Sequence, residues 1–240
     1  MSFLSGLYPY QGVMLIAGTL LFVVALILLV VLAVAGKEIG KLFLFFGLSI
    51  VMIGFPAYTK IEISKDGVTL EKDTTKLLQN PTDKALRDSV SANVSKLSAR
   101  PLSDPNTLST LARAQIALGD DGAAEQNVKK ALQIAPRNAD AVAVQKRLEL
   151  DRNLAQLTTA VEHSPNDPNA KAQLDQVVRE ASQIQLASPV TITNLARAHA
   201  ALGNQTQATA NVDKALQIDP NLAPALILKN KMNMTNGTPH

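Results

Sequence analysis

The amino-acid sequence predicts an all-α protein with an N-terminal transmembrane helical hairpin, a short β-hairpin and an α-solenoid built from a duplicated 84-residue unit. Long apolar stretches with almost no charge fill residues 1–58. Every aromatic residue lies at or before Tyr58, so the rest of the chain must build its core from Ala, Leu, Val and Ile, which suit close helix packing. From residue 72 onward the chain repeats itself at a constant offset, which is typical of a repeat architecture.

Two segments of the predicted membrane anchor, residues 1–58, are apolar enough to cross a bilayer. Residues 13–35 contain no charge and no proline, and as a helix they span about 35 Å, against a bilayer core of about 30 Å. Residues 42–58 form the second, shorter span. The small residues 33–35 resemble a signal-peptide cleavage site. However, no Lys or Arg precedes the apolar run and the second span follows at once, so we expect both helices to be retained.

The short linker between the spans predicts a tight antiparallel hairpin, with the N-terminus and the large domain on one side of the membrane. Lys37 and Lys41 lie in the linker. Four lysines follow the second span: Lys60, Lys65, Lys72 and Lys76. The positive-inside rule therefore favours a cytoplasmic domain on a bacterial inner membrane, with a periplasmic domain as the alternative.

Residues 59–71 are predicted to form a β-hairpin linker. Apolar and polar residues alternate in the stretches IEIS (61–64) and VTLE (68–71), and an Asp-Gly pair lies between them. Alternation around Asp-Gly is the usual signal for two strands joined by a tight turn.

The remaining chain is a duplication, with units predicted at residues 72–150 and 151–234 and a disordered tail at residues 235–240. The sequence LARAQIALG (111–119) returns as LARAHAALG (195–203), and KALQIAP (130–136) returns as KALQIDP (214–220). Across residues 111–136, 16 of 26 positions are identical to their counterparts.

Each unit contains a helix–turn–helix pair preceded by an extra helix. Asp104 is a good N-cap and Pro105 suits the first helical position. Gly119 and Gly203 can end the first helix in the left-handed conformation. Apolar residues at helical spacing mark the extra helix of the first unit: Leu86, Val90, Val94 and Leu97.

Residues 105–138 and 189–222 resemble tetratricopeptide repeats. Each is 34 residues long, ends near a proline (Pro136 and Pro220) and carries small residues at the expected places, which are Ala112, Ala124 and Ala131, then Ala196, Ala208 and Ala215. The family's bulky aromatic residues are replaced by aliphatic ones. The resemblance implies a helical solenoid with a groove that binds a protein segment.

The sequence offers no catalytic constellation, so we expect a protein that is not an enzyme and has no cofactor. There is no cysteine, and His163, His199 and His240 are scattered, with no motif of paired metal ligands. His199 is best interpreted as a packed residue. The charge balance beyond residue 59 is nearly even, without a clustered basic face, which argues against nucleic acid as a partner. No small-molecule substrate is evident.

Arg113 and Arg197 are the candidate partner-binding residues. They occupy equivalent places on the first helix of each repeat, the helix that lines the groove in the family that the chain resembles. Four polar neighbours complete the candidate site: Ser109, Thr110, Thr193 and Asn194. Arginine is enriched at binding hot spots. The alternative is two solvated arginines inherited through duplication.

These features predict a membrane-anchored scaffold or assembly factor that binds a peptide or helix of a partner protein in a helical groove. The first alternative is a structural subunit of a larger membrane complex, with the transmembrane hairpin as its interface. The second is an assembly subunit of the kind used in cytochrome c maturation, which also joins two membrane helices to such repeats. The short linker between the spans differs from the long loop of that family.

Overall fold

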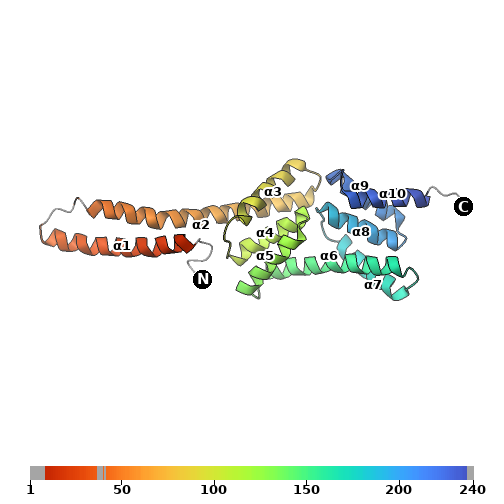
Figure 1. Cartoon of the computed structure of the whole chain (residues 1–240), viewed down its shortest axis with the longest axis horizontal. Helices are drawn as coiled ribbons and strands as arrows, with labels where there is room; N and C mark the ends of the chain where they lie inside the picture. Colours follow the sequence, from red (N-terminus) through yellow and green to blue (C-terminus); the bar gives the residue numbers. More distant parts are fainter. Residues whose placement is uncertain (1–8, 37–39, 41, 237–240) are drawn as a thin grey trace.

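The computed structural model describes residues 9–36, 40 and 42–236. The described residues form an elongated, all-helical molecule with a helical hairpin at one end and a helical domain at the other (Figure 1). Its helices are α1 (Pro9–Val34), α2 (Leu42–Gln79), α3 (Lys84–Ser98), α4 (Pro105–Leu118), α5 (Asp121–Ile134), α6 (Ala139–His163), α7 (Pro168–Ser182), α8 (Pro189–Ala201), α9 (Gln205–Ile218) and α10 (Ala223–Asn236). Residues 237–240 of the predicted tail lie outside the described residues.

Helices α1 and α2 pack closely in the hairpin because Gly18 has no side chain. A Cβ atom at Gly18 would lie 2.8 Å from Cβ of Met52 and 3.3 Å from the backbone nitrogen of Ile53. Small residues allow such close approach between helices. At the domain end of the hairpin, the buried Gln11 donates a hydrogen bond from Nε2 to Oγ1 of Thr59, at 3.3 Å.

The prediction of a β-hairpin at residues 59–71 is wrong, because these residues lie inside α2, a continuous helix of 38 residues. Ile63, Gly67 and Leu70 fall on one helical face and are buried against the domain. A Cβ at Gly67 would lie 3.7 Å from Cγ2 of Thr107 in α4, so this glycine marks a helix–helix contact rather than a turn. Among the described residues no strand is present, and the helical part of the fold prediction is confirmed.

One face of α2 packs first against α1 and then against the domain. Its buried residues follow a spacing of seven, or of four and three: Leu42, Ser49, Pro56, Ile63, Gly67, Leu70, Thr74 and Leu77. This heptad-like repeat keeps a single stripe in contact along the whole helix. The hairpin and the domain are therefore joined by an uninterrupted helix.

Four helices of the first repeat unit have counterparts in the second at the 84-residue offset: α3 with α7, α4 with α8, α5 with α9, and the first half of α6 with α10. The second half of α6 matches the end of α2, so α6 takes part in both units. Buried residues also correspond, as Leu108 with Ile192 and Val128 with Val212 show. Each unit is thus a bundle around its own aliphatic core.

The helix ends follow the caps that the sequence predicts. The side chain of Asp104 accepts a hydrogen bond from the backbone N–H of Thr107, at 2.7 Å. Gly119 ends α4 with φ of 95°, in the left-handed conformation that favours glycine, and Gly203 has φ of 82°.

Candidate protein-binding cleft

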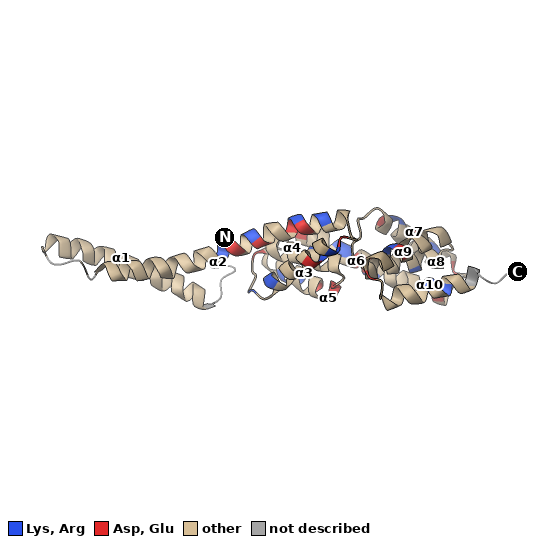
Figure 2. Ribbon diagram, turned by 90° about the horizontal axis from the view of Figure 1, so that it is seen from above, with Lys and Arg blue, Asp and Glu red and all other residues tan. Residues whose placement is uncertain are grey.

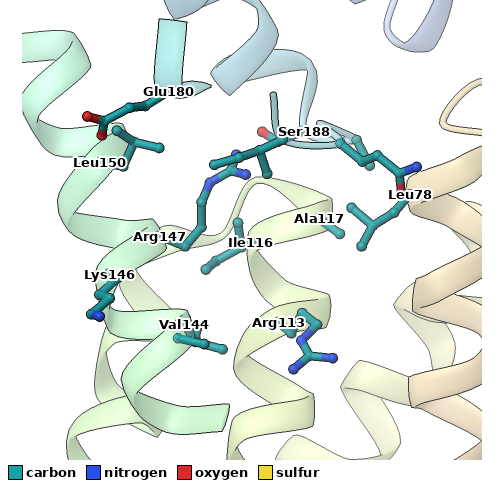
Figure 3. Close-up of a pocket in the computed structure, with 14 residues that line it drawn as sticks. Leu78, Arg113, Ile116, Ala117, Val144, Lys146, Arg147, Leu150, Glu180 and Ser188 are labelled. Atoms are coloured by element: carbon teal, nitrogen blue, oxygen red, sulfur yellow. The ribbon is translucent and has the colours of Figure 1, made fainter. Parts of the chain in front are cut away.

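A cleft of about 450 Å³ lies where the two repeat units meet. Its walls come from the end of α2, from α4, from α6 and from the segment that joins α7 to α8 (Figure 3). Most lining side chains are apolar: Leu78, Ile116, Ala117, Ala143, Val144, Leu150, Ile184 and Ala187. The polar lining residues are Arg113, Lys146, Arg147, Glu180, Gln185 and Ser188. The cleft can therefore receive an apolar side chain and offer charged groups to the atoms around it.

Arg113, predicted from the sequence, lines this cleft from α4. Its Nη2 lies 3.5 Å from Oδ1 of Asp140, whose side chain is 59% exposed. A single long contact with an exposed carboxylate contributes little to stability. The guanidinium of Arg113 can therefore leave Asp140 for a ligand at small cost.

Arg147 enters the cleft from α6, with its guanidinium directed toward Ser188 (Figure 3). Its Nε donates to both carboxylate oxygens of Asp151, at 3.0 and 3.2 Å. Burial raises the pKa of Asp151, and the attraction of Arg147 opposes this shift. Burial also raises the pKa of Asp121, at the start of α5, against the attraction of the same arginine. The ion pair with the buried Asp151 therefore holds Arg147 in place in the cleft.

The second predicted arginine, Arg197, does not line the cleft. It pairs instead with Glu162 at the end of α6, with Nη2 2.5 Å from Oε2. The structure thus places the two equivalent arginines in different surroundings, one at the junction of the units and one on the outer part of the second unit.

The four polar neighbours divide into buried and half-buried residues. Ser109 and Thr193 are buried, and their hydroxyls donate to the backbone carbonyls of Pro105 and Pro189, both at 2.7 Å. Each of these hydrogen bonds joins the hydroxyl to the carbonyl one helical turn earlier, so the hydroxyl is occupied within its own helix. Thr110 and Asn194 are half-buried, and none of the four lines the cleft.

In the first unit, charged side chains occupy the equivalent place between α2 and α3. Lys96 lies 3.7 Å from Glu62 and 2.8 Å from Asp66, and Arg100 lies 3.1 Å from Glu62. The hydrogen bond that Lys96 donates to the carboxylate of Asp66 raises the pKa of Lys96.

The second unit replaces these charged pairs with different residues. Lys146 and Glu180 stand where Glu62 and Lys96 stand in the first unit, with the charges exchanged. Leu150 and Ile184 replace Asp66 and Arg100. All four replacements line the cleft. The sequence could have indicated the cleft through these differences between the two copies. A search for residues that the copies share overlooks them.

The interpretation of His199 as a packed residue agrees with its burial. It is 8% exposed, and burial lowers its pKa against the attraction of Asp175. Its counterpart Gln115 accepts a hydrogen bond from Asn127 at 2.8 Å, whereas Nδ1 of His199 is buried without a partner in the described part of the chain. Across residues 9–36, 40 and 42–236, no group of three or more acidic or histidine side chains could hold a metal ion.

Both helices of the hairpin are long and apolar enough to cross a membrane. Only 11% of the most apolar stretch of α1 and 17% of that of α2 are buried within the structure. Figure 2 shows Lys, Arg, Asp and Glu on the domain and on the part of α2 that packs against it, and none on the described part of α1 or on the part of α2 beside α1.

Comparison with known proteins finds one family. Residues 106–138 and 191–222 match the family model for tetratricopeptide repeats, close to the two segments that the sequence predicted. No curated protein and no solved structure matches the chain. The helix pairs α4–α5 and α8–α9 are therefore tetratricopeptide repeats, and the predicted resemblance is confirmed. This class of helical repeat generally mediates protein–protein interaction rather than catalysis.

Proposed function

We propose that this protein is a membrane-anchored scaffold or assembly factor that binds a segment of a partner protein in the cleft between its repeat units. The apolar cleft at the junction of the units is the observation that carries the proposal. Its position depends on both units at once, since α4 belongs to the first and the α7–α8 segment to the second. An apolar side chain of the partner fills the cleft, and Arg113 and Lys146 bind polar groups beside it.

The anchor is supported by what α1 exposes. The side chains of Val13, Ile16 and Leu20 are 67%, 60% and 69% exposed. In water, apolar side chains exposed over a whole helix would be costly, whereas in a bilayer they contact lipid. The core helix of a soluble protein would bury these side chains. Carbonate-washed membranes should therefore retain the full chain, and its recovery in the wash would exclude the anchor.

A photocrosslinking experiment tests the cleft directly. A photoreactive amino acid at Ala143, which is exposed and lines the cleft, should crosslink to a partner protein in native membranes. The matched control is Ile227, the equivalent exposed position of the second unit, which does not line this cleft. Ala143→Trp, probed from a photoreactive residue at Gln185, should reduce the crosslinked species at least fivefold. Equal crosslinking from Ala143 and Ile227 would refute the cleft as the binding site.

We further infer that the repeat domain faces the cytoplasm of a bacterial inner membrane, on the lysine count around the two spans. A reporter that is active only in the periplasm, fused after Met232, should then be silent. Activity of this reporter would place the domain in the periplasm.

A structural subunit of a larger membrane complex is the second candidate. An apolar groove of about 640 Å³ runs along α1 beside Ile53 and is lined by Leu15, Ile16, Thr19, Leu20, Val23 and Val24. A transmembrane helix of another subunit fits such a groove. Crosslinks from Leu20 rather than from Ala143 would favour this function.

A further inference from the structure

The outer face of α2, opposite the stripe that packs against the domain, carries an exposed line of residues at every seventh position. Beyond the predicted span this line consists of Ile61, Val68 and Thr75, and Gly47 and Gly54 continue it toward the hairpin loop. Ile61 is 68% exposed and Val68 is 65% exposed. At about 1.5 Å per residue, Val68 lies about 15 Å beyond Tyr58, past the end of the predicted membrane span.

The duplication provides an internal comparison for these two positions. In the second unit, Gln145 and Arg152 of α6 are the counterparts of Ile61 and Val68, and both are exposed. The two equivalent positions thus carry polar residues in α6, whereas in α2 they carry apolar, β-branched residues. Because Ile61 and Val68 are aligned on one face of α2, while the equivalent positions of α6 are polar, we take them as the sign of a contact that α2 makes and α6 does not.

The charges beside the line suit a second copy of this chain. Glu71 and Lys72 follow Val68 by three and four residues, so they lie on either side of the line. Both are exposed, and neither forms an ion pair among the described residues. When two parallel copies of α2 meet along this line, Glu71 of each helix faces Lys72 of the other. The face is then complementary to itself, as a two-fold interface requires.

We propose that two copies of this protein associate in parallel along the outer face of α2, with Ile61 and Val68 at the centre of the interface. This proposal rests on the proposed anchor, because insertion in one membrane makes the two copies parallel. β-branched residues at alternate contact positions of a helical seam favour two-stranded parallel pairs. Lys65, beside Ile61, carries its charged end outward on a flexible stem.

Single-cysteine crosslinking tests this interface, because the chain has no cysteine of its own. Cysteine placed at Ile61, Val68 or Thr75 should form a disulfide-linked dimer in membranes under mild oxidation. Thr69 and Lys76 are the matched controls, since each lies one residue further and about 100° around the helix. We expect at least fivefold more dimer at the three line positions than at the two controls.

A second variant uses the residues that the chain itself places at the equivalent positions of α6. Ile61→Gln with Val68→Arg, in the Thr75→Cys background, should reduce the dimer to the control level while helicity stays unchanged. Equal crosslinking at neighbouring positions, or no dimer at any, would overturn the interface. Carbonate extraction of the same membranes separates the two failures: a chain released by the wash refutes the anchor as well, whereas a retained chain refutes only the pairing.

Discussion

The buried pair of Arg147 and Asp151 offers a sharp test of how the two units are stabilised. Their side chains are 15% and 8% exposed, and both carboxylate oxygens of Asp151 accept from Nε of Arg147. Arg147→Ala leaves the carboxylate of Asp151 buried without its partner. Breaking a buried pair in this way typically costs about 3–5 kcal/mol. For a domain of this size that corresponds to a fall in Tm of roughly 6–20 °C.

The first unit supplies the matched control for this change. Ile63 and Gly67 of α2 occupy the places of Arg147 and Asp151 and are buried without any charge. The double variant Arg147→Ile with Asp151→Ala removes both charges together and should stay within about 1 kcal/mol of the original protein, because replacing a whole buried pair by apolar residues is often neutral or stabilising.

Thermal unfolding of the full chain in detergent, followed by circular dichroism, measures both variants. The single variant should also recover part of its stability in acid, since protonation neutralises the stranded carboxyl group of Asp151. A loss below about 1 kcal/mol in the single variant would show that the pair is solvated in solution. An equal loss in both variants would show that side-chain packing, and not the charge of Asp151, is responsible.

Three other changes have defined outcomes. Gly18→Val should separate α1 from α2, because its side chain would meet Met52, and cysteine crosslinking between the two helices should fall; an unchanged yield would refute the close packing. Acid should destabilise the domain through His199: its pKa is lowered by burial, so its contribution is full above about pH 6.5 and is lost as the pH falls below that value. His199→Gln, which copies Gln115, should reduce the difference between urea midpoints at pH 7.5 and pH 5, and an unchanged difference would assign it to other groups. Insertion of one residue after Tyr58 should rotate Gly54 about 100° away from the line of Ile61 and Val68, so that crosslinking between copies from a cysteine at Gly54 falls while crosslinking from a cysteine at Val68 persists, whereas insertion of seven residues should preserve both. Unchanged crosslinking from Gly54 after the single insertion would show that α2 does not transmit its register.

The sequence was sufficient to predict the apolar hairpin and the repeated helix pairs, because both depend on local patterns. The prediction for residues 59–71 was wrong because the structure there depends on contacts between residues far apart in the sequence. Its alternating residues fit a strand, but Glu62 and Asp66 also fit a helix and form ion pairs with Lys96 and Arg100, which lie thirty or more residues away in the sequence. These distant partners stabilise the helix, and no local pattern reveals them.

The candidate site was only partly predictable. Arg113 was identified because it is repeated at Arg197, yet repetition did not give the two arginines the same surroundings. Ser109 and Thr193 are shared by both copies because their hydroxyls bond to the backbone, which is a structural role. The cleft instead uses residues such as Leu150, where the copies differ. A search among residues shared by the two copies therefore finds core residues rather than those of the proposed binding cleft.

The continuity of α2 determines where the proposed cleft lies relative to the hairpin. Leu78, which lines the cleft, lies twenty residues after Tyr58 on the same helix, or about 30 Å along its axis. A β-hairpin linker would have left this distance free to vary, whereas a helix whose buried stripe packs against both the hairpin and the domain fixes it. With the hairpin in a membrane, as proposed, a partner segment must extend well beyond the lipid surface to reach the cleft. This requirement favours a partner with an extramembrane domain or tail over one confined to the bilayer.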